Sequence, residues 1–159
     1  MIEYHVVPIK GKLMMSPIKE QIIEANRHFG WNEAQTLMDF NNEHSEYYCL
    51  VNQDKLLGYV ALHHILDEAS INMVYIDKTF RQQGLATELL VFVLNQLSQR
   101  QVKNIFLEVR ASNHSAIHLY QKTGFDLLIN RKNYYQNPME DAYIFQKNLT
   151  KGDQDESKE

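Results

Sequence analysis

The chain has almost no cysteine, and this limits how it can be stabilised. Cys49 is the single cysteine among 159 residues, so no disulfide framework can form within the chain. This composition fits a reducing compartment. Because Cys49 lies in YYCLV, an apolar stretch typical of a strand, we expect a buried thiol rather than a nucleophile.

Long apolar runs are also missing. The longest run, Leu89 to Leu94, has six residues, whereas a membrane-spanning helix needs roughly 20. The first residues, MIEYHVVPIKGK, lack the apolar segment of a secretory signal peptide. We therefore expect a cytoplasmic protein with no membrane partner.

An excess of basic residues is lacking as well. The formal net charge is −4, which disfavours a nucleic-acid-binding protein. The charge is uneven, however, because residues 78–132 hold eight Lys or Arg against three Asp or Glu. This segment could attract a polyanionic small molecule, or its charges could simply be scattered over the surface.

The length and composition predict one folded domain. Hydrophobic residues make up 44% of the chain and charged residues 23%, which is ordinary for a globular protein. We find neither internal repeats nor an internal linker. We therefore predict a single domain over residues 1–149, followed by a disordered charged tail, TKGDQDESKE, over residues 150–159.

Apolar periodicity predicts seven strands and four helices. The strands are expected at residues 2–8, 47–53, 56–65, 71–76, 104–109, 125–130 and 141–149. The helices are expected at residues 17–28, 33–41, 84–100 and 115–123. Ser16 resembles a helix cap followed by Pro17 in the first helical position, and Asn32 with Gln35 resembles a capping box. This order predicts a mixed α/β sheet with at least one βαβ crossover.

The stretch RQQGLA joins an apolar strand to the longest helix. The first turn of a helix has unpaired N–H groups and partial positive charge, and it can bind phosphate. Gly84 allows close approach of a bulky anion, and small Ala86 keeps that approach open. Arg81 could contact phosphate, with Gln82 and Gln83 at the rim. The same pattern also fits an ordinary glycine-containing turn with a solvated Arg.

RQQGLA resembles the [RQ]xxGx[GA] motif of the GNAT N-acetyltransferases, whereas the P-loop and GxGxxG patterns are absent. A second stretch, LEVRASNHSAIHLYQKTGF, followed by RKNYY and PMEDA, resembles the RimI type within that superfamily. Those enzymes acetylate the N-terminal alanine of a small-subunit ribosomal protein. The resemblance implies the GNAT fold, a mixed sheet of about seven strands with a splayed central strand pair and about four helices.

The resemblance also implies acetyl-coenzyme A as co-substrate and no metal. Its pyrophosphate would lie in the RQQGLA turn, and the preceding strand would offer backbone groups to the pantetheine arm. The residues that this assigns to the cofactor are Val74, Tyr75, Ile76, Arg81, Gln82, Gln83, Gly84, Leu85, Ala86, Thr87 and Asn113.

Acetyl transfer needs a group that takes a proton from the acceptor amine. In NIFLEVR, strand alternation places Phe106, Glu108 and Arg110 on one face. A carboxylate in a central strand costs free energy unless it is paired or functional. The residues alone favour a structural ion pair of Glu108 with Arg110 or a loop cation. The resemblance implies instead that Glu108 is the general base, acting directly or through a water.

Asn113 and Tyr120 lie seven residues apart and share one face of a predicted helix. Periodicity alone indicates a capping Asn and a core Tyr. The resemblance implies that Tyr120 protonates the leaving thiolate and that Asn113 hydrogen-bonds the cofactor. A phenol with a pKa of about 10 can donate to a thiolate whose thiol has a pKa of about 8.5. The oxyanion would contact a backbone N–H between Met73 and Ile76.

Two aromatic residues are candidates for acceptor binding, namely Trp31 and Tyr134. Tyr134, together with its neighbour Tyr135, could wall the acceptor slot. The alternatives are that Trp31 anchors the first two helices and that Tyr134 and Tyr135 pack as aromatic residues in a loop. At pH 7 about a tenth of α-amines are neutral, against far fewer lysines, so a carboxylate base suffices more readily for an N-terminus.

Histidines provide no clear metal site. His114 and His118 are four residues apart on a predicted helix, but no Cys or acidic partner with ligand spacing stands nearby. His63 and His64 would point to opposite faces of a strand, and we interpret them as structural or surface residues.

Three functions remain open at this point. The first is acetylation of a protein N-terminus, with the ribosomal alanine as acceptor. The second is acetylation of a small-molecule amine or of other protein amines. The third is a non-catalytic acyl-coenzyme A-binding module, which would need neither Glu108 nor Tyr120. We expect no nucleic-acid partner, and the oligomeric state stays open.

Overall fold

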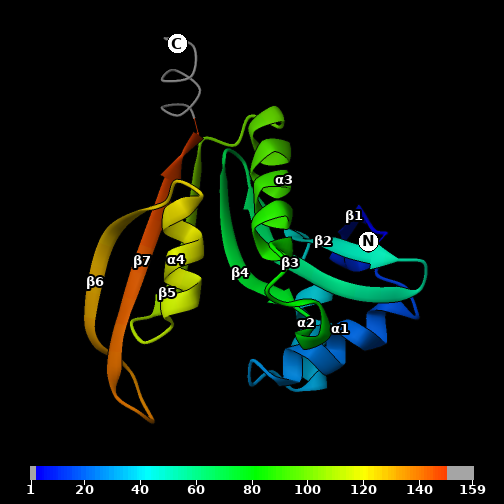
Figure 1. Cartoon of the computed structure of the whole chain (residues 1–159), viewed down its shortest axis with the longest axis horizontal. Helices are drawn as coiled ribbons and strands as arrows, with labels where there is room; N and C mark the ends of the chain where they lie inside the picture. Colours follow the sequence, from blue (N-terminus) through cyan, green and yellow to red (C-terminus); the bar gives the residue numbers. More distant parts are fainter. Residues whose placement is uncertain (1–2, 150–159) are drawn as a thin grey trace.

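A computed structural model describes residues 3–149, and the predicted tail over residues 150–159 lies outside this range (Figure 1). Within it, seven strands and four helices follow the expected order. The strands are β1 (His5–Lys10), β2 (Ser45–Asn52), β3 (Lys55–Ile65), β4 (Glu68–Ile76), β5 (Asn104–Arg110), β6 (Asp126–Tyr135) and β7 (Glu140–Asn148). The helices are α1 (Ile18–Arg27), α2 (Glu33–Phe40), α3 (Leu85–Gln99) and α4 (His114–Lys122), with 3-10 turns η1 (Gly11–Leu13) and η2 (Lys78–Phe80).

The seven strands form one mixed sheet in the order β1-β2-β3-β4-β5-β7-β6. All neighbouring pairs are antiparallel except β4 and β5, which the crossover helix α3 connects. These two strands pair only from Glu68–Ile71 to Asn104–Leu107, and beyond that they diverge (Figure 1). The predicted fold class, a mixed sheet with a splayed central strand pair, is confirmed.

Alternate residues of the sheet enter two apolar cores on opposite faces. On one face, Tyr48 and Leu50 of β2 pack with Leu90 of α3. On the other face, Cys49 packs with Ile22 of α1. Burial raises the pKa of the Cys49 thiol to about 12, so the expected buried, unreactive thiol is confirmed. Among the described residues, no helix is long and apolar enough to cross a membrane.

The two predicted helix starts differ in outcome. The capping box is confirmed, because Asn32 and Gln35 exchange backbone and side-chain hydrogen bonds of 2.8 Å each. The predicted Ser16 cap is wrong. Helix α1 begins at Ile18 after Pro17, and the Ser16 hydroxyl donates to the carboxylate of Glu20. The Ser16 side chain therefore bonds to a carboxylate one helical turn later and does not cap a backbone N–H of α1.

Strands β1 and β6 end later than the sequence indicated. The edge strand β1 continues past Pro8 to Lys10, which an edge position tolerates because one side of the strand needs no hydrogen-bond donor. Strand β6 continues past Asn130 to Tyr135, because β7 pairs with it as far as Tyr135 opposite Glu140. The RKNYY stretch is therefore a strand rather than a loop.

Candidate active site

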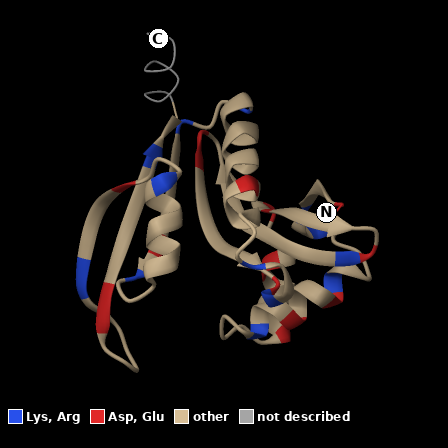
Figure 2. Ribbon diagram, viewed as in Figure 1, with Lys and Arg blue, Asp and Glu red and all other residues tan. Residues whose placement is uncertain are grey.

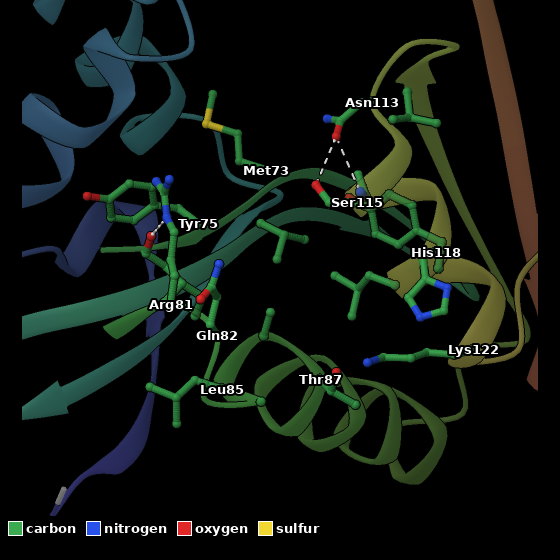
Figure 3. A pocket seen from close by; sticks show the side chains of 18 of the residues that line it. Met73, Tyr75, Arg81, Gln82, Leu85, Thr87, Asn113, Ser115, His118 and Lys122 are labelled. Carbon is green, nitrogen blue, oxygen red and sulfur yellow. Dashed lines mark hydrogen bonds between the residues drawn. The ribbon is translucent and has the colours of Figure 1, made fainter. Parts of the chain in front are cut away.

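A cleft of about 540 Å³ lies between β4, the N-terminus of α3 and the helix α4 (Figure 3). The structure brings together all the predicted cofactor residues in its lining except Gln83, which is exposed on the same turn. The lining residues that were predicted are Val74, Tyr75, Ile76, Arg81, Gln82, Gly84, Leu85, Ala86, Thr87 and Asn113.

The turn before α3 has a backbone that leaves room for a ligand. Gly84 has a φ of 78°, in the left-handed region that disfavours other residues, and a Cβ built there would meet nothing within 4 Å. No side chain caps the first turn of α3, so its N–H groups face the cleft without a protein cap. Arg81 Nε donates to the Ile76 carbonyl at 2.8 Å, which fixes its guanidinium beside this turn.

The exposed edge of β4 presents backbone groups to the same cleft. The N–H of Asp77 donates to the carbonyl of Leu57 on β3 at 2.8 Å. Because backbone groups alternate sides along an antiparallel strand, those of Tyr75 also face β3, and those of Val74 and Ile76 face away from it. The N–H and C=O groups of Val74 and the N–H of Ile76 thus point to the opening between β4 and β5. Tyr75 can contribute only its side chain to the cleft.

Helix α4 supplies the opposite wall. The predicted cap is confirmed, because the Asn113 side chain accepts from the N–H of Ala116 at 3.2 Å. Tyr120 is 8% exposed and packs against Phe125 and Phe145, as the core interpretation predicted. It also lines the cleft, and burial raises its pKa to about 12. Its phenol therefore keeps its proton at neutral pH and can donate it into the cleft.

A second cavity, of about 530 Å³, lies on the sheet face that carries α1 and α2. Its lining comes from β3, β4, β5, the β6–β7 hairpin and the segment before α2. Glu108 and Asn72 line both this cavity and the cleft. These are the first residues of β5 and β4 beyond the last paired positions. The opening in the sheet therefore connects the two spaces, with the Glu108 carboxylate at the junction.

Glu108 has a partner that the sequence did not suggest. The Tyr135 hydroxyl donates to Glu108 Oε1 at 2.6 Å. The alternative of an ion pair with Arg110 is wrong, because Arg110 Nη1 lies 3.5 Å from Glu140 Oε1 and its guanidinium stacks on the Tyr135 ring. Burial, and next the bond to the Glu108 carboxylate, raise the Tyr135 pKa, which keeps this phenol a donor.

The two predicted acceptor-side aromatic residues lie differently. Trp31 lines the second cavity and also packs on the apolar core under α1, so its two interpretations are compatible. Tyr134 is 48% exposed and packs edge-on against Tyr135, with ring centroids 5.3 Å apart. Tyr135 lines the cavity in its place.

Several cleft residues were not predicted. Ser115, His118 and Lys122 of α4 line the cleft, and their spacing of three and four residues was a usable signal of a shared helix face (Figure 3). Among residues 3–149, no group of three His, Cys, Asp or Glu side chains could hold a metal ion.

The positive charge of residues 78–132 is only partly gathered at the cleft. Arg81 and Lys122 line it. Other Lys and Arg positions lie elsewhere, among them Arg110 on β5 and Arg131 on β6, and Figure 2 shows basic positions at separate places on the ribbon. The attraction of a polyanion would therefore come from two charges and the α3 N-terminus rather than from a broad basic surface.

The mixed sheet opens beside α3, a helix whose N-cap is Gly84. This arrangement is that of an acetyltransferase fold. Residues 17–125 match the acetyltransferase (GNAT) family, and the chain belongs to this family. The predicted family and the predicted acyltransferase class are thus confirmed.

Curated relatives cover most of the chain. The [ribosomal protein bS18]-alanine N-acetyltransferase of Haemophilus ducreyi is 35% identical over 133 residues, which span 79% of this chain and 90% of that protein. The enzyme of the same name from Escherichia coli K12 is 35% identical over 125 residues, 77% of this chain and 84% of that protein. The crystal structure of the Escherichia coli ribosomal-protein-S18-alanine N-acetyltransferase superposes with a TM-score of 0.81 at 26% identity, covering 92% of this chain and 94% of that one.

Proposed function

We propose that the chain transfers the acetyl group of acetyl-coenzyme A to the N-terminal α-amine of a protein, with the N-terminal alanine of ribosomal protein bS18 as acceptor. The observation that carries this proposal is the pair of spaces on opposite faces of the sheet that meet at Glu108. Relatives with this activity match the chain over most of their length. A ribosomal acceptor also supports a cytoplasmic location.

The cleft fits the donor in shape and in chemistry. Acetyl-coenzyme A supplies an acetyl thioester, an amide-rich pantetheine arm and a diphosphate. The uncapped first turn of α3 and the open space over Gly84 suit the diphosphate, with Arg81 beside it. Val74 and Ile76 offer backbone groups to the amides of the arm. The N–H of Ile76 or of Val74 would then stabilise the oxyanion.

Glu108 and Tyr120 complete the proton transfers on either side of the opening. Tyr135 holds Glu108 Oε1, which leaves Oε2 to take the proton of the acceptor amine directly or through a water. As the new C–N bond forms and the C–S bond breaks, the Tyr120 phenol donates its proton to the departing sulfur. Burial raises the Tyr120 pKa to about 12, which keeps the phenol protonated until the C–S bond breaks. Because this pKa lies above that of a thiol, the phenolate left after the transfer is the stronger base and regains a proton from solvent.

The second cavity suits an extended acceptor. It is lined by Trp31 and Tyr135 on either side of the sheet opening and is open to solvent rather than enclosed. An N-terminus entering there reaches Glu108 with its α-amine first. Because α-amines titrate near pH 8, a carboxylate can deprotonate them far more readily than lysine side chains.

The test compares acceptors with one donor. The protein is incubated with acetyl-coenzyme A and a peptide that begins with the bS18 alanine, an N-terminally blocked peptide with an internal lysine, or small-molecule amines. Mass spectrometry of the products should show one acetyl group on the α-amine of the first peptide only. Acetylation of lysine or of small amines alone would refute the proposed acceptor.

Two variants test the assigned roles. Glu108→Gln and Tyr120→Phe should each lower kcat about 100-fold or more, the usual loss for a missing acid or base. Calorimetry should show that both still bind acetyl-coenzyme A within about twofold of the unaltered protein. Full turnover in both variants would contradict these roles, and binding without turnover by the unaltered protein would identify a non-catalytic module.

A further inference from the structure

A buried carboxylate outside the catalytic junction has an unusual set of partners. Asp39 of α2 is 8% exposed and accepts hydrogen bonds from Ser45 Oγ at 2.9 Å, Tyr47 OH at 2.5 Å and His63 Nε2 at 2.6 Å. Burial tends to raise the Asp39 pKa, but the bonds from His63, Tyr47 and Ser45 outweigh it, so the net shift is downward. Asp39 is therefore a fixed negative charge.

The three donors differ in what else they contact. Ser45 and Tyr47 are buried, so their hydroxyl groups serve only the core. The His63 side chain is 30% exposed and lines the second cavity. Because Nε2 contacts Asp39, Nδ1 is the ring nitrogen left for a ligand in the cavity, and in the tautomer with its proton on Nε2 it accepts a hydrogen bond. A buried carboxylate thus holds one imidazole at the cavity wall.

The strand register places His63 relative to Glu108. His63 pairs with Ser70 of β4, and Ser70 pairs with Phe106 of β5, two residues before Glu108. The Cα atoms of His63 and Glu108 are thus two strand spacings apart across the sheet and two residues apart along it. Together these offsets give a separation of roughly 12 Å. An extended peptide advances about 3.4 Å per residue. A peptide whose amine lies at Glu108 therefore passes His63 at about its fourth or fifth residue.

We propose that His63, held in place by Asp39, binds the backbone of the acceptor peptide at its fourth or fifth residue. The contact is a hydrogen bond from a peptide N–H to Nδ1. This inference rests on the proposed function in that the acceptor is a peptide. It assigns His63 to peptide binding rather than to catalysis, because its Cα lies roughly 12 Å from that of Glu108.

The variant His63→Gln separates this role from a structural one. A Gln amide can still donate to Asp39 but places no acceptor where Nδ1 lies. Trp31, the single tryptophan of the chain, lines the same cavity, so its fluorescence reports peptide binding without turnover. We expect both Kd and KM for an Ala-initiated hexapeptide to rise threefold to tenfold, the loss of about one hydrogen bond. The KM for acetyl-coenzyme A should stay unchanged.

The matched control is His64→Gln. His64 lies on the opposite face of β3, where it contacts Arg100 and the Leu66 carbonyl, so its replacement should leave hexapeptide binding unchanged. Alanine amide, which lacks a second residue, should react with the same KM in His63→Gln as in the unaltered protein. Thermal unfolding shows whether each variant is folded.

Each outcome decides the inference. Hexapeptide binding that is equally tight in His63→Gln overturns it, and so does an equal loss for alanine amide, which would place His63 at the amine. Absence of hexapeptide binding by the unaltered protein overturns it as well. Binding without acetylation would refute the proposed function alone, because the fluorescence comparison of the two proteins would still test His63.

Discussion

Replacing Gly84 by alanine adds one methyl group, which should lower the stability of the fold and weaken donor binding by separate physical effects. The backbone of Gly84 is left-handed, with a φ of 78°. An L-residue in this conformation costs about 1–2 kcal/mol. A Cβ at Gly84 would meet no atom within 4 Å, so no steric clash adds to this strain. At roughly 2–4 °C per kcal/mol for a chain of this size, Gly84→Ala should lower Tm by about 2–8 °C.

The same methyl group should also weaken donor binding. It would project into the space that we assign to the diphosphate, and it would keep the anion from the first N–H groups of α3. Hydrogen bonds to charged groups contribute about 1.5–3 kcal/mol each. The loss of one such bond corresponds to a Kd for acetyl-coenzyme A that is roughly 10- to 100-fold higher.

Gly30 provides a matched control. It has a φ of 85°, and a Cβ there would also meet nothing within 4 Å. Gly30→Ala should therefore lower Tm by a similar amount and leave the Kd of acetyl-coenzyme A unchanged. Calorimetry and thermal unfolding measure the two effects separately. If Gly84→Ala lost stability but bound acetyl-coenzyme A as tightly as Gly30→Ala, the diphosphate would lie elsewhere and the assignment would be refuted.

Two further predictions concern single side chains. Burial tends to raise the Glu46 pKa, but hydrogen bonds from Arg100 and Lys10 outweigh it and lower that pKa from 4.5 to about 2. The ionised Glu46 therefore stabilises the folded protein above pH 4.5, and this stabilisation is lost as the pH falls toward 2. The Tm of Glu46→Gln should therefore fall less between pH 6 and pH 3 than the Tm of the unaltered protein. Equal decreases in the two Tm values would contradict this. Tyr135→Phe removes the hydroxyl that donates to Glu108. In steady-state assays this variant should show a kcat about tenfold lower, with the Kd of acetyl-coenzyme A unchanged. An unchanged kcat would show that Tyr135 does not position the base.

Local signals predicted the elements around the proposed donor side, and the resemblance of RQQGLA to the GNAT motif assigned the donor to them. The RQQGLA turn, the long helix after it and the periodicity of α4 each lie within about 20 residues, so their geometry follows from hydrogen bonding and apolar spacing along one segment. The capping box of Asn32 with Gln35 is predictable for the same reason. Donor-side residues could be named before any tertiary contact was known.

The acceptor side could not be predicted in the same way. Tyr135 meets Glu108 only because β6 extends along β7 to Tyr135, whose side chain reaches past β7 to the carboxylate on β5. His63 meets Asp39 only because α2 packs beside the end of β3. These contacts depend on strand register and helix docking, which periodicity does not encode. A charged residue in a strand such as Glu108 signals that a partner exists without indicating which residue it is.

The position of the site follows from where the parallel pairing of β4 and β5 ends. Backbone groups in the middle of a sheet must find partners, and paired parallel strands satisfy them while burying apolar side chains on both faces. Beyond Ile71 and Leu107 this pairing stops, and the next residues, Asn72 and Glu108, are polar and line both spaces. The amides of a pantetheine arm could replace the missing neighbour strand on one face while a peptide approaches from the other. In the proposed function, the interruption of the sheet therefore supplies both the backbone groups that hold the donor and the passage through which an amine reaches it.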